Sequence, residues 1–290
     1  MNLTNPSTIA ALCEEFGFKF KKKFGQNFLI NPEIPKKIAA SSVGDSRPSA
    51  CIEIGPGAGS LTSELAQIYD KVTAFEIDSQ LIPVLEKTLA DYDNVTVINQ
   101  DILEVDLKKY IEDNFEGYSV VVCANLPYYI TTPIVMQLFE SGARIDKIVV
   151  MMQKEVAQRL VARAGSPDYG SITPTVEYYA KTTRLFDVAP GNFMPRPDVT
   201  STVVCFSVHK TPPVSPVNKD YLFKTIKGAF ALRRKTLQNS LATEFSNLSK
   251  AELAECIENA GLSPSARGET LNLQDLSRLA DSIYNKIAPQ

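Results

Sequence analysis

The stretch ACIEIGPGAGSL, residues 50–61, joins an apolar run to a glycine-rich loop and then to a helical pattern. Its opening residues have the composition of a buried strand. Leu61, Leu65 and Ile68 then recur at helical spacing and give one apolar helix face. Glycines between a strand and a helix let the backbone approach a ligand closely beside the helix N-terminus. The stretch therefore predicts an α/β fold with a ligand at the carboxyl end of this strand.

Later strands are also predicted to end in polar residues. Glu76 ends the next apolar run, 21 positions after Gly55, and an acid at about this distance binds ribose hydroxyls in nucleoside sites. Asp101 follows a third run and could accept a hydrogen bond from an adenine amino group, or it could be an N-cap or turn residue. Asn125 follows a fourth run. Because strands and helices alternate here, these ends should meet on one rim of a parallel sheet.

The spacing of the glycines discriminates between ligands. The loop reads G-x-G-x-G and is preceded by Glu53, whereas dinucleotide-binding loops read G-x-G-x-x-G to cradle a pyrophosphate. This spacing favours a sulfonium nucleoside such as S-adenosylmethionine. It opposes an NAD-dependent oxidoreductase, which stays as an alternative. No G-x-x-x-x-G-K-[ST] motif occurs in the chain, and its absence argues against an NTPase.

The tetrapeptide at residues 125–128, after the fourth predicted strand, combines an amide side chain, a proline-restricted backbone and an aromatic ring. Pro127 has no N–H and keeps Leu126 extended, so the Leu126 carbonyl can face a ligand. The Asn125 side chain offers an acceptor, and Tyr128 offers a flat face. This set suits an exocyclic amino group on a planar heterocycle, although a plain strand–turn–helix corner is the alternative. Phe193, in a proline-rich turn, could complete an aromatic sandwich around an extruded base or be a buried loop anchor.

Two short segments are strongly basic, although the net charge of the whole chain is −3. Residues 19–23 include four lysines, and residues 219–235 carry six basic side chains against one acid. Such segments can contact RNA phosphates, or they can be solvated helix faces. The residues that follow the first segment, 26–29, either pack on the core as an N-terminal arm or close over a cofactor.

Length and composition bound the remaining possibilities. The 290 residues suit one large domain with a smaller one, and the proline-rich linker 211–217 separates residues 1–210 from a helical segment, 211–290. The lone histidine, His209, argues against histidine catalysis and multi-histidine metal sites. Five scattered cysteines suit a reducing cytoplasm and form no zinc motif. No apolar run is long enough for a membrane span, and the N-terminus lacks a signal-peptide layout.

Taken together and in order, these motifs resemble those of the ribosomal RNA adenine N6,N6-dimethyltransferases, and among them most closely the bacterial small-subunit type. The matching segments are residues 23–29, 53–62, 76–78, 100–101, 125–133 and 193–201. The resemblance implies an α/β, Rossmann-like domain that uses S-adenosylmethionine, followed by a small all-α C-terminal domain. It covers about residues 10–210 and extends to the basic segment 229–241.

The resemblance also implies which residues would bind the cofactor S-adenosylmethionine. By matching position, Asn27 and Leu29 would close on it and Gly55 would contact its methionine part. Glu76 would bind its ribose and Asp101 its adenine.

The implied target is a pair of adjacent adenines near the 3′ end of 16S rRNA, within the small ribosomal subunit or its precursor. Asn125 would lie between cofactor and target, and Leu126, Tyr128 and Phe193 would hold the target base. We expect a cytoplasmic monomer that needs no metal and no membrane. Two alternatives stay open: the large-subunit enzyme that confers macrolide resistance, and a ribosome-assembly factor in which methylation is secondary.

Overall fold

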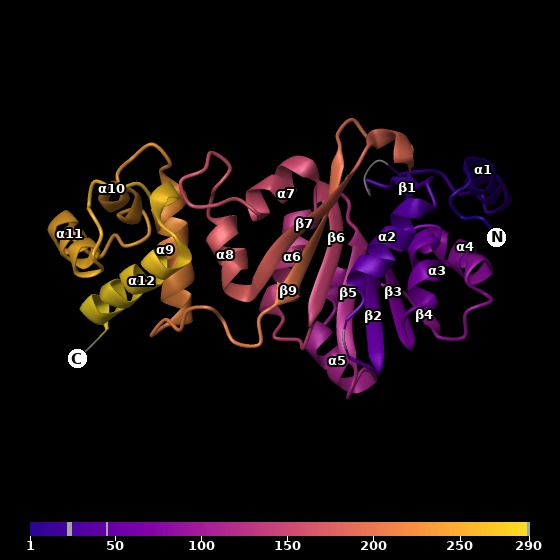
Figure 1. The fold of residues 1–290 in the computed structure, drawn as a ribbon, viewed down its shortest axis with the longest axis horizontal. Helices are drawn as coiled ribbons and strands as arrows, with labels where there is room; N and C mark the ends of the chain where they lie inside the picture. The colour runs from indigo at the N-terminus through magenta and orange to yellow at the C-terminus, as the bar shows by residue number, and fades with distance from the viewer. Residues whose placement is uncertain (22–24, 45, 289–290) are drawn as a thin grey trace. The chain divides into compact units, whose positions relative to one another are not determined.

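The computed structural model describes residues 1–21, 25–44 and 46–288, so Lys22 and Lys23 of the basic arm lie outside the described residues (Figure 1). The chain divides into two compact units. The first contains Met1–Ala157 and Thr183–Val208, and the second contains Gln158–Thr182 and His209–Gln290. The chain passes into the second unit for the last time at His209, close to the boundary predicted at residue 210. The inclusion of Gln158–Thr182 in the second unit was not foreseen from the sequence.

Within the described residues the first unit is built on a seven-stranded sheet of order β4-β3-β2-β5-β6-β9-β7. The five strands from β4 to β6 are parallel, and β9 runs antiparallel to β6. This arrangement confirms the predicted α/β class. The strands are β2 (Ser49–Ile54), β3 (Lys71–Glu76), β4 (Val95–Asn99), β5 (Ser119–Asn125), β6 (Lys147–Gln153), β7 (Ala180–Val188) and β9 (Ser201–Val208).

Helices cover both faces of this sheet, because alternate side chains of its buried strands point to opposite faces. On one face α2 (Glu33–Ser42) and α3 (Ser60–Ala66) share a core with Cys51, Val121 and Val149. On the other face α5 (Leu107–Asn114) and α6 (Thr131–Glu140) contact sheet aromatics. Those ring pairs are Phe75–Tyr110, at 5.2 Å, and Phe139–Phe206, at 5.6 Å.

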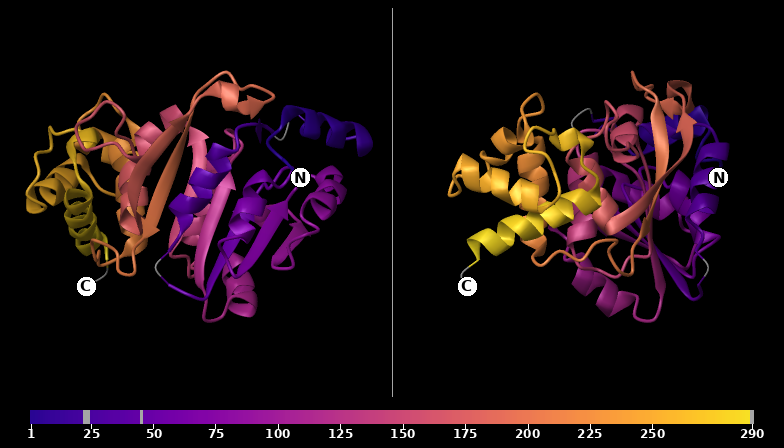
Figure 2. Two further views of the ribbon diagram at one scale, coloured as in Figure 1. Left: turned by 45° about the vertical axis from the view of Figure 1, so that its right-hand side comes forward. Right: turned by 60° about the vertical axis from the view of Figure 1, so that its left-hand side comes forward.

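A second, two-stranded sheet joins the N-terminal arm to the turn before β9. In it β1 (Phe28–Leu29) pairs antiparallel with β8 (Phe193–Met194), and Leu29 lies opposite Phe193. Figure 2 shows β7 and β9 extending beyond their neighbours toward this turn. The helices α1 (Pro6–Glu15) and α4 (Ile82–Thr88), with Phe28, form a separate apolar cluster beside the arm.

The second unit is helical and has its own apolar core. Its elements, apart from the end of α7 (Lys154–Leu160) and the start of β7, are α8 (Ile172–Tyr179), α9 (Lys219–Ala231), α10 (Leu237–Leu241), α11 (Lys250–Asn259) and α12 (Leu273–Ile287). Helices α11 and α12 each begin with a capping box, formed by Ser249 with Glu252 and by Asn272 with Asp275. The basic segment does not continue α9, which ends at Ala231 before three exposed cations, Arg233, Arg234 and Lys235.

One close backbone contact inside the second unit gives a stability prediction. A Cβ added at Gly268 would lie 2.1 Å from the carbonyl oxygen of Ala229 in α9, so the backbone would have to move. Gly268→Ala should therefore lower the free energy of unfolding by about 1–3 kcal/mol, the range for overpacking.

Chemical denaturation followed by circular dichroism measures this change. Gly170→Ala is the matched control, because a Cβ there would meet nothing within 4 Å and should change stability by less than about 0.5 kcal/mol. Equal stabilities for the two variants would contradict the contact.

Candidate functional site

A cavity lies at the carboxyl ends of β2, β3 and β5, between the residues that follow these strands and residues 25–29. The strand register explains its position. Ile54 pairs with Phe75 and with Ala124, so the next residues of the three strands are Gly55, Glu76 and Asn125. Most of the residues proposed from the sequence line this cavity: Asn27, Leu29, Gly55, Glu76, Asn125, Leu126 and Tyr128.

The glycine loop forms one wall of the cavity. Gly55 and Gly57 have φ of 69° and 61°, a region that glycine adopts readily and other residues rarely. A Cβ at Gly57 would lie 3.1 Å from the ring of Phe28, whereas a Cβ at Gly55 would meet nothing within 4 Å. The loop therefore packs against the arm at Gly57 and leaves open space beside the Gly55 backbone, where a ligand can approach.

Two buried carboxyl groups face the cavity. Glu53 is 1% exposed, and its Oε2 has no hydrogen-bond partner among the described residues. Burial raises its pKa to about 8, and the hydroxyl of the nearby Thr62 offsets only part of this rise. Glu76 accepts the N–H of Asp78 at 2.8 Å and that of Gly57 at 3.3 Å. Burial raises the Glu76 pKa to about 7 despite these hydrogen bonds.

Glu53 was noted in the sequence only as the residue preceding the glycine loop. The available signal was an acid inside a strand that is otherwise apolar and buried along its length. A buried carboxyl without a partner is costly unless something else compensates it. A cationic group bound in the cavity would supply that compensation.

Asn125 and its neighbours form the opposite wall. The Asn125 Nδ2 donates to the backbone carbonyl of Asn27 at 3.1 Å, so its Oδ1 remains as an acceptor. The N–H of Leu126 donates to the Met151 carbonyl at 3.2 Å, and no described residue donates to the Leu126 carbonyl oxygen. The Tyr128 hydroxyl is 2.8 Å from Ser201 Oγ, which fixes the ring at the edge of the cavity.

Two of the proposed residues do not line the cavity. Asp101 caps the short 3-10 helix Ile102–Glu104, and its Oδ1 accepts the N–H of Leu103 at 3.0 Å. Phe193 is 3% exposed and packs in the core beside Leu29. In this structure both residues therefore adopt the purely structural alternatives that their sequence context allowed.

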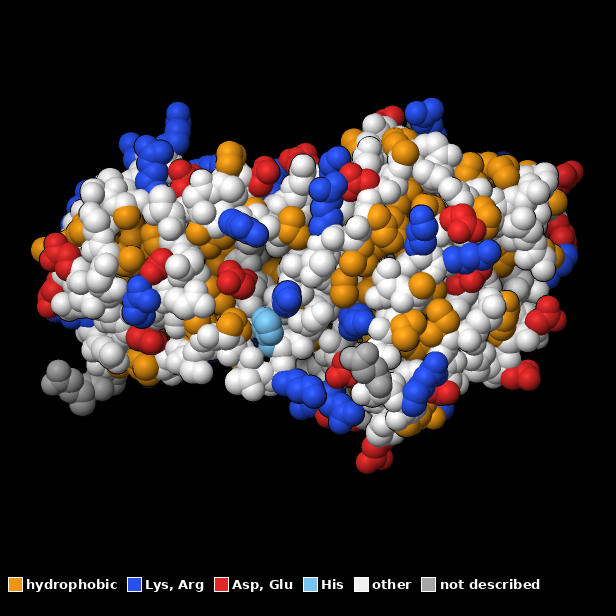
Figure 3. All heavy atoms as spheres, in the orientation of Figure 1, with side chains coloured by type: hydrophobic (Ala, Val, Ile, Leu, Met, Phe, Trp, Pro, Cys, Tyr) orange, Lys and Arg blue, Asp and Glu red, His pale blue; other side chains and the backbone are white. Residues whose placement is uncertain are grey.

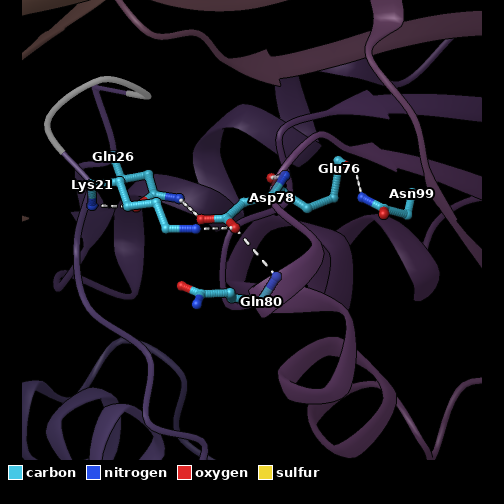
Figure 4. Close-up of polar contacts among 6 residues, drawn as sticks. All are labelled: Lys21, Gln26, Glu76, Asp78, Gln80 and Asn99. Atoms are coloured by element: carbon cyan, nitrogen blue, oxygen red, sulfur yellow. Dashed lines mark hydrogen bonds and ion pairs between the residues drawn. The ribbon is translucent and has the colours of Figure 1, made fainter.

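A polar cluster that the sequence analysis did not identify holds Lys21 and Gln26 of the N-terminal arm beside the loop that follows Glu76. Asp78 accepts hydrogen bonds from Lys21 Nζ at 2.7 Å and from Gln26 Nε2 at 3.0 Å (Figure 4). The Lys21 N–H in turn donates to Gln26 Oε1 at 2.9 Å. One of the lysines expected to meet phosphates is thus engaged in an ion pair. Partners 57 and 52 positions apart give no local sequence signal.

The basic segment of the second unit is partly neutralised. Lys227 pairs with Glu244 at 2.9 Å and Arg233 with Glu269 at 3.4 Å. Figure 3 shows Lys and Arg side chains interspersed with acids across the face it draws. Among the described residues there is no group of three or more His, Cys, Asp or Glu side chains that could hold a metal ion. The described part of the chain also contains no helix long and apolar enough to cross a bilayer.

Comparison with known proteins gives consistent matches. The family model for ribosomal RNA adenine dimethylase matches residues 17–277. The ribosomal RNA small subunit methyltransferase A of Alkaliphilus metalliredigens is 45% identical over 97% of this chain and 98% of its own length. The protein of the same name from Staphylococcus aureus is 46% identical over 96% and 94%.

Solved structures agree at the level of the fold. A dimethyladenosine transferase from Plasmodium falciparum superposes with a TM-score of 0.74 and 26% identity, covering 89% of this chain and 97% of that chain. The 23S rRNA methyltransferase ErmE superposes with a TM-score of 0.67 and 24% identity, covering 88% and 99%. The predicted Rossmann-like methyltransferase fold is therefore confirmed.

The buried acids give a pH prediction for the ligand-free protein. The usual glutamate pKa is 4.5, so above that pH the unfolded chain has released protons that the folded protein keeps up to about pH 8 at Glu53 and about pH 7 at Glu76. Stability should therefore fall as the pH rises from 5 to 8. Glu53→Gln should flatten this fall and raise stability at pH 8 by about 1–3 kcal/mol, since it removes a buried charge.

Urea denaturation at several pH values measures both curves. Glu112→Gln changes an exposed glutamate of α5 and is the control, expected to keep the wild-type slope. Parallel curves for wild type and Glu53→Gln would show that Glu53 is not buried without a partner.

Proposed function

The chain belongs to the ribosomal RNA adenine dimethylase family, and we propose that it transfers methyl groups from S-adenosylmethionine to the N6 amino groups of two adjacent adenines near the 3′ end of 16S rRNA. Family membership makes the chain an enzyme that methylates adenines of ribosomal RNA. The observation that carries the finer proposal is the position of Asn125, whose amide borders the same cavity as Gly55 and Glu76.

The cavity fits S-adenosylmethionine group by group. The unpaired Glu53 Oε2 suits an ammonium group, and the open space at Gly55 leaves room for the methionine part beside the backbone. The Glu76 carboxylate suits a ribose diol. Leu29 closes the cavity from the arm, and Ile77 lies on the Glu76 side.

Asp101 keeps its proposed role as a partner of the cofactor's adenine on the strength of the family resemblance alone. Its carboxylate has two oxygens, and one of them accepts the Leu103 N–H that caps the 3-10 helix. An adenine amino group would need the other oxygen. An Asp101→Ala variant tests this role, because it should weaken binding of S-adenosylmethionine while leaving binding of a ribose-methionine fragment unchanged.

The chemistry proposed for this site is direct displacement. The cofactor, when bound, would supply an electrophilic methyl group on a sulfonium; its C–S bond would break as the bond to N6 forms, so that a neutral thioether leaves and N6 releases one proton. The adenine N6 lone pair is conjugated with the ring and is a weak nucleophile. By accepting the two N6 hydrogens, Asn125 Oδ1 and the Leu126 carbonyl would turn this lone pair out of conjugation and toward the methyl group. Positioning and fixed dipoles supply most of the acceleration.

The target adenine has to leave its stack to reach this wall. Tyr128, fixed by Ser201, offers a face for the extruded base, and such stacking contributes about 1–3 kcal/mol per base. Phe193 would provide the second face only if the turn that carries it rearranged, since its ring is buried against Leu29. We retain it as a proposed base contact that requires this change.

The proposed target is 16S rRNA in the small ribosomal subunit or its precursor. The support is the name shared by the two relatives at 45% and 46% identity. The exposed cations Arg234 and Lys235 are the proposed phosphate contacts, which makes affinity salt-dependent. We further propose that the enzyme acts as a monomer, and in the cytoplasm because its substrate is ribosomal RNA. Size-exclusion chromatography with light scattering tests the oligomeric state.

The large-subunit alternative rests on the same architecture, and the likeness to ErmE, at 24% identity, supports the fold alone. Incubation of the enzyme with precursor small subunits and with 23S transcripts separates the two targets. Methylation of the subunits is expected, and methylation of 23S RNA alone would overturn the proposed target. NAD in place of S-adenosylmethionine in a binding titration tests the oxidoreductase alternative.

Asn125→Ala should abolish methyl transfer while largely sparing RNA binding. Loss of a preorganised acceptor at the reacting group costs about 10²–10³ in kcat. Incorporation of labelled methyl groups into precursor small subunits measures turnover, and a filter-binding assay measures affinity for RNA. The control is Asn114→Ala, since Asn114 ends α5 and its side chain donates to the Tyr110 carbonyl of the same helix, away from the cavity.

Near-wild-type turnover by Asn125→Ala would refute the mechanism. If this variant is inactive but cells that carry it assemble ribosomes and grow normally, the assembly role is the main one.

A further inference from the structure

The N-terminal arm, defined as Lys21 and residues 25–31, is held against the cavity from several sides. Asn27 and Leu29 of the arm line the cavity directly. The Asn27 carbonyl accepts the Asn125 side chain, and Asn31 Nδ2 donates to Asn192 Oδ1 at 2.8 Å beside the β1–β8 pairing. These contacts hold residues 27–31, the far end of the arm, whereas Lys21 and Gln26, at its near end, are held by Asp78.

Asp78 receives the near end of the arm. Its side chain is 1% exposed, and both of its oxygens accept from arm residues: Oδ1 from Lys21 Nζ at 2.7 Å and Oδ2 from Gln26 Nε2 at 3.0 Å (Figure 4). Oδ1 also accepts the N–H of Gln80 at 3.2 Å, which holds the carboxylate on its own loop. Gln26 itself lines the cavity beside Asn27, so this anchor acts at the cavity wall.

Asp78 also hydrogen-bonds Glu76, the residue proposed to bind the ribose of the cofactor. The backbone N–H of Asp78 donates to Glu76 Oε1 at 2.8 Å. Glu76 is held from the other side by the N–H of Gly57. Asp78 therefore connects the arm to the carboxylate that faces the cavity, through one side chain and one peptide group.

The chemistry of the anchor favours a charged aspartate. Burial by itself would raise the Asp78 pKa, but the hydrogen bonds from Lys21 and Gln26 lower it below its usual range. Removing one member of a buried ion pair or hydrogen-bonded group is strongly unfavourable, because the groups that remain are then buried without a partner. Loss of the carboxylate charge should thus release the near end of the arm.

We propose that Asp78 is a positioning residue for the cofactor: by binding Lys21 and Gln26 it keeps Asn27 and Leu29 against the cavity and so slows escape of bound S-adenosylmethionine. This inference rests on the proposed function. Asp78 touches neither the transferred methyl group nor the target base in this assignment, so its effect should fall on cofactor affinity more than on turnover.

The test compares Asp78→Asn with the wild-type full-length chain. Asparagine places an NH₂ group where one of the two donors now points, so the anchor cannot form with both arm residues. Isothermal titration with S-adenosylmethionine, without RNA, should show a Kd raised about tenfold or more, the effect of losing hydrogen bonds to a charged group. At saturating cofactor, kcat should change less than about threefold, whereas KM for the cofactor should rise with Kd.

Asp70→Asn is the matched control. Asp70 precedes β3, the strand that Asp78 follows, and it too pairs with a cation, Arg47, at 3.1 Å. It is not among the residues that line the cavity, so its substitution should leave the Kd for the cofactor unchanged. Lys21→Met should weaken cofactor binding as Asp78→Asn does. The double variant should bind the cofactor as tightly as the single variant with the higher Kd, because both substitutions remove the same contact.

The outcomes separate this inference from the proposed function. If the wild-type chain does not bind S-adenosylmethionine, the proposed function fails. If it binds, and Asp78→Asn binds within about twofold of Asp70→Asn, the role of Asp78 is overturned. Circular dichroism checks folding, and if Asp78→Asn does not fold, Lys21→Met, at a residue that does not line the cavity, carries the same test with the same two outcomes.

Discussion

The parallel register of β2, β3 and β5 is the constraint on which the site depends. Because Ile54 pairs with both Phe75 and Ala124, the chain leaves the three strands together at Gly55, Glu76 and Asn125. A slip of one residue would turn the side chains of the slipped strand to the other face and separate these groups. The proposed cofactor site at Gly55 and Glu76 and the neighbouring amide of Asn125 therefore both follow from one pattern of hydrogen bonds between strands.

The site retains groups that cost stability. Glu53 has a buried oxygen without a partner, and Glu76 sits where burial works against its charge. A core built only for stability would replace such groups with apolar ones. Departures of this kind are expected at functional sites, where a ligand rather than the fold provides the missing partner. The arm adds a further such feature, since a buried carboxylate at Asp78 anchors it.

The sequence predicted the parts of the fold and site that depend on local pattern. Strand ends, the glycine loop and the helix faces follow from periodicity and from turn chemistry, and they placed Gly55, Glu76 and Asn125 on one rim. Contacts between distant segments could not be read in this way. The burial of Phe193 depends on its pairing with Leu29, and the Asp78 anchor joins residues more than 50 positions apart. The inclusion of residues 158–182 in the helical unit likewise reflects tertiary packing.

The central claim is that this rim brings a methyl donor to the amino group of an adenine in 16S rRNA. Mass spectrometry of 16S rRNA from cells that lack the protein tests it most directly. The account predicts that the two adjacent adenines near the 3′ end lose both methyl groups and regain them when the wild-type gene is restored. Dimethylated adenines that persist at these positions without the protein would contradict the account.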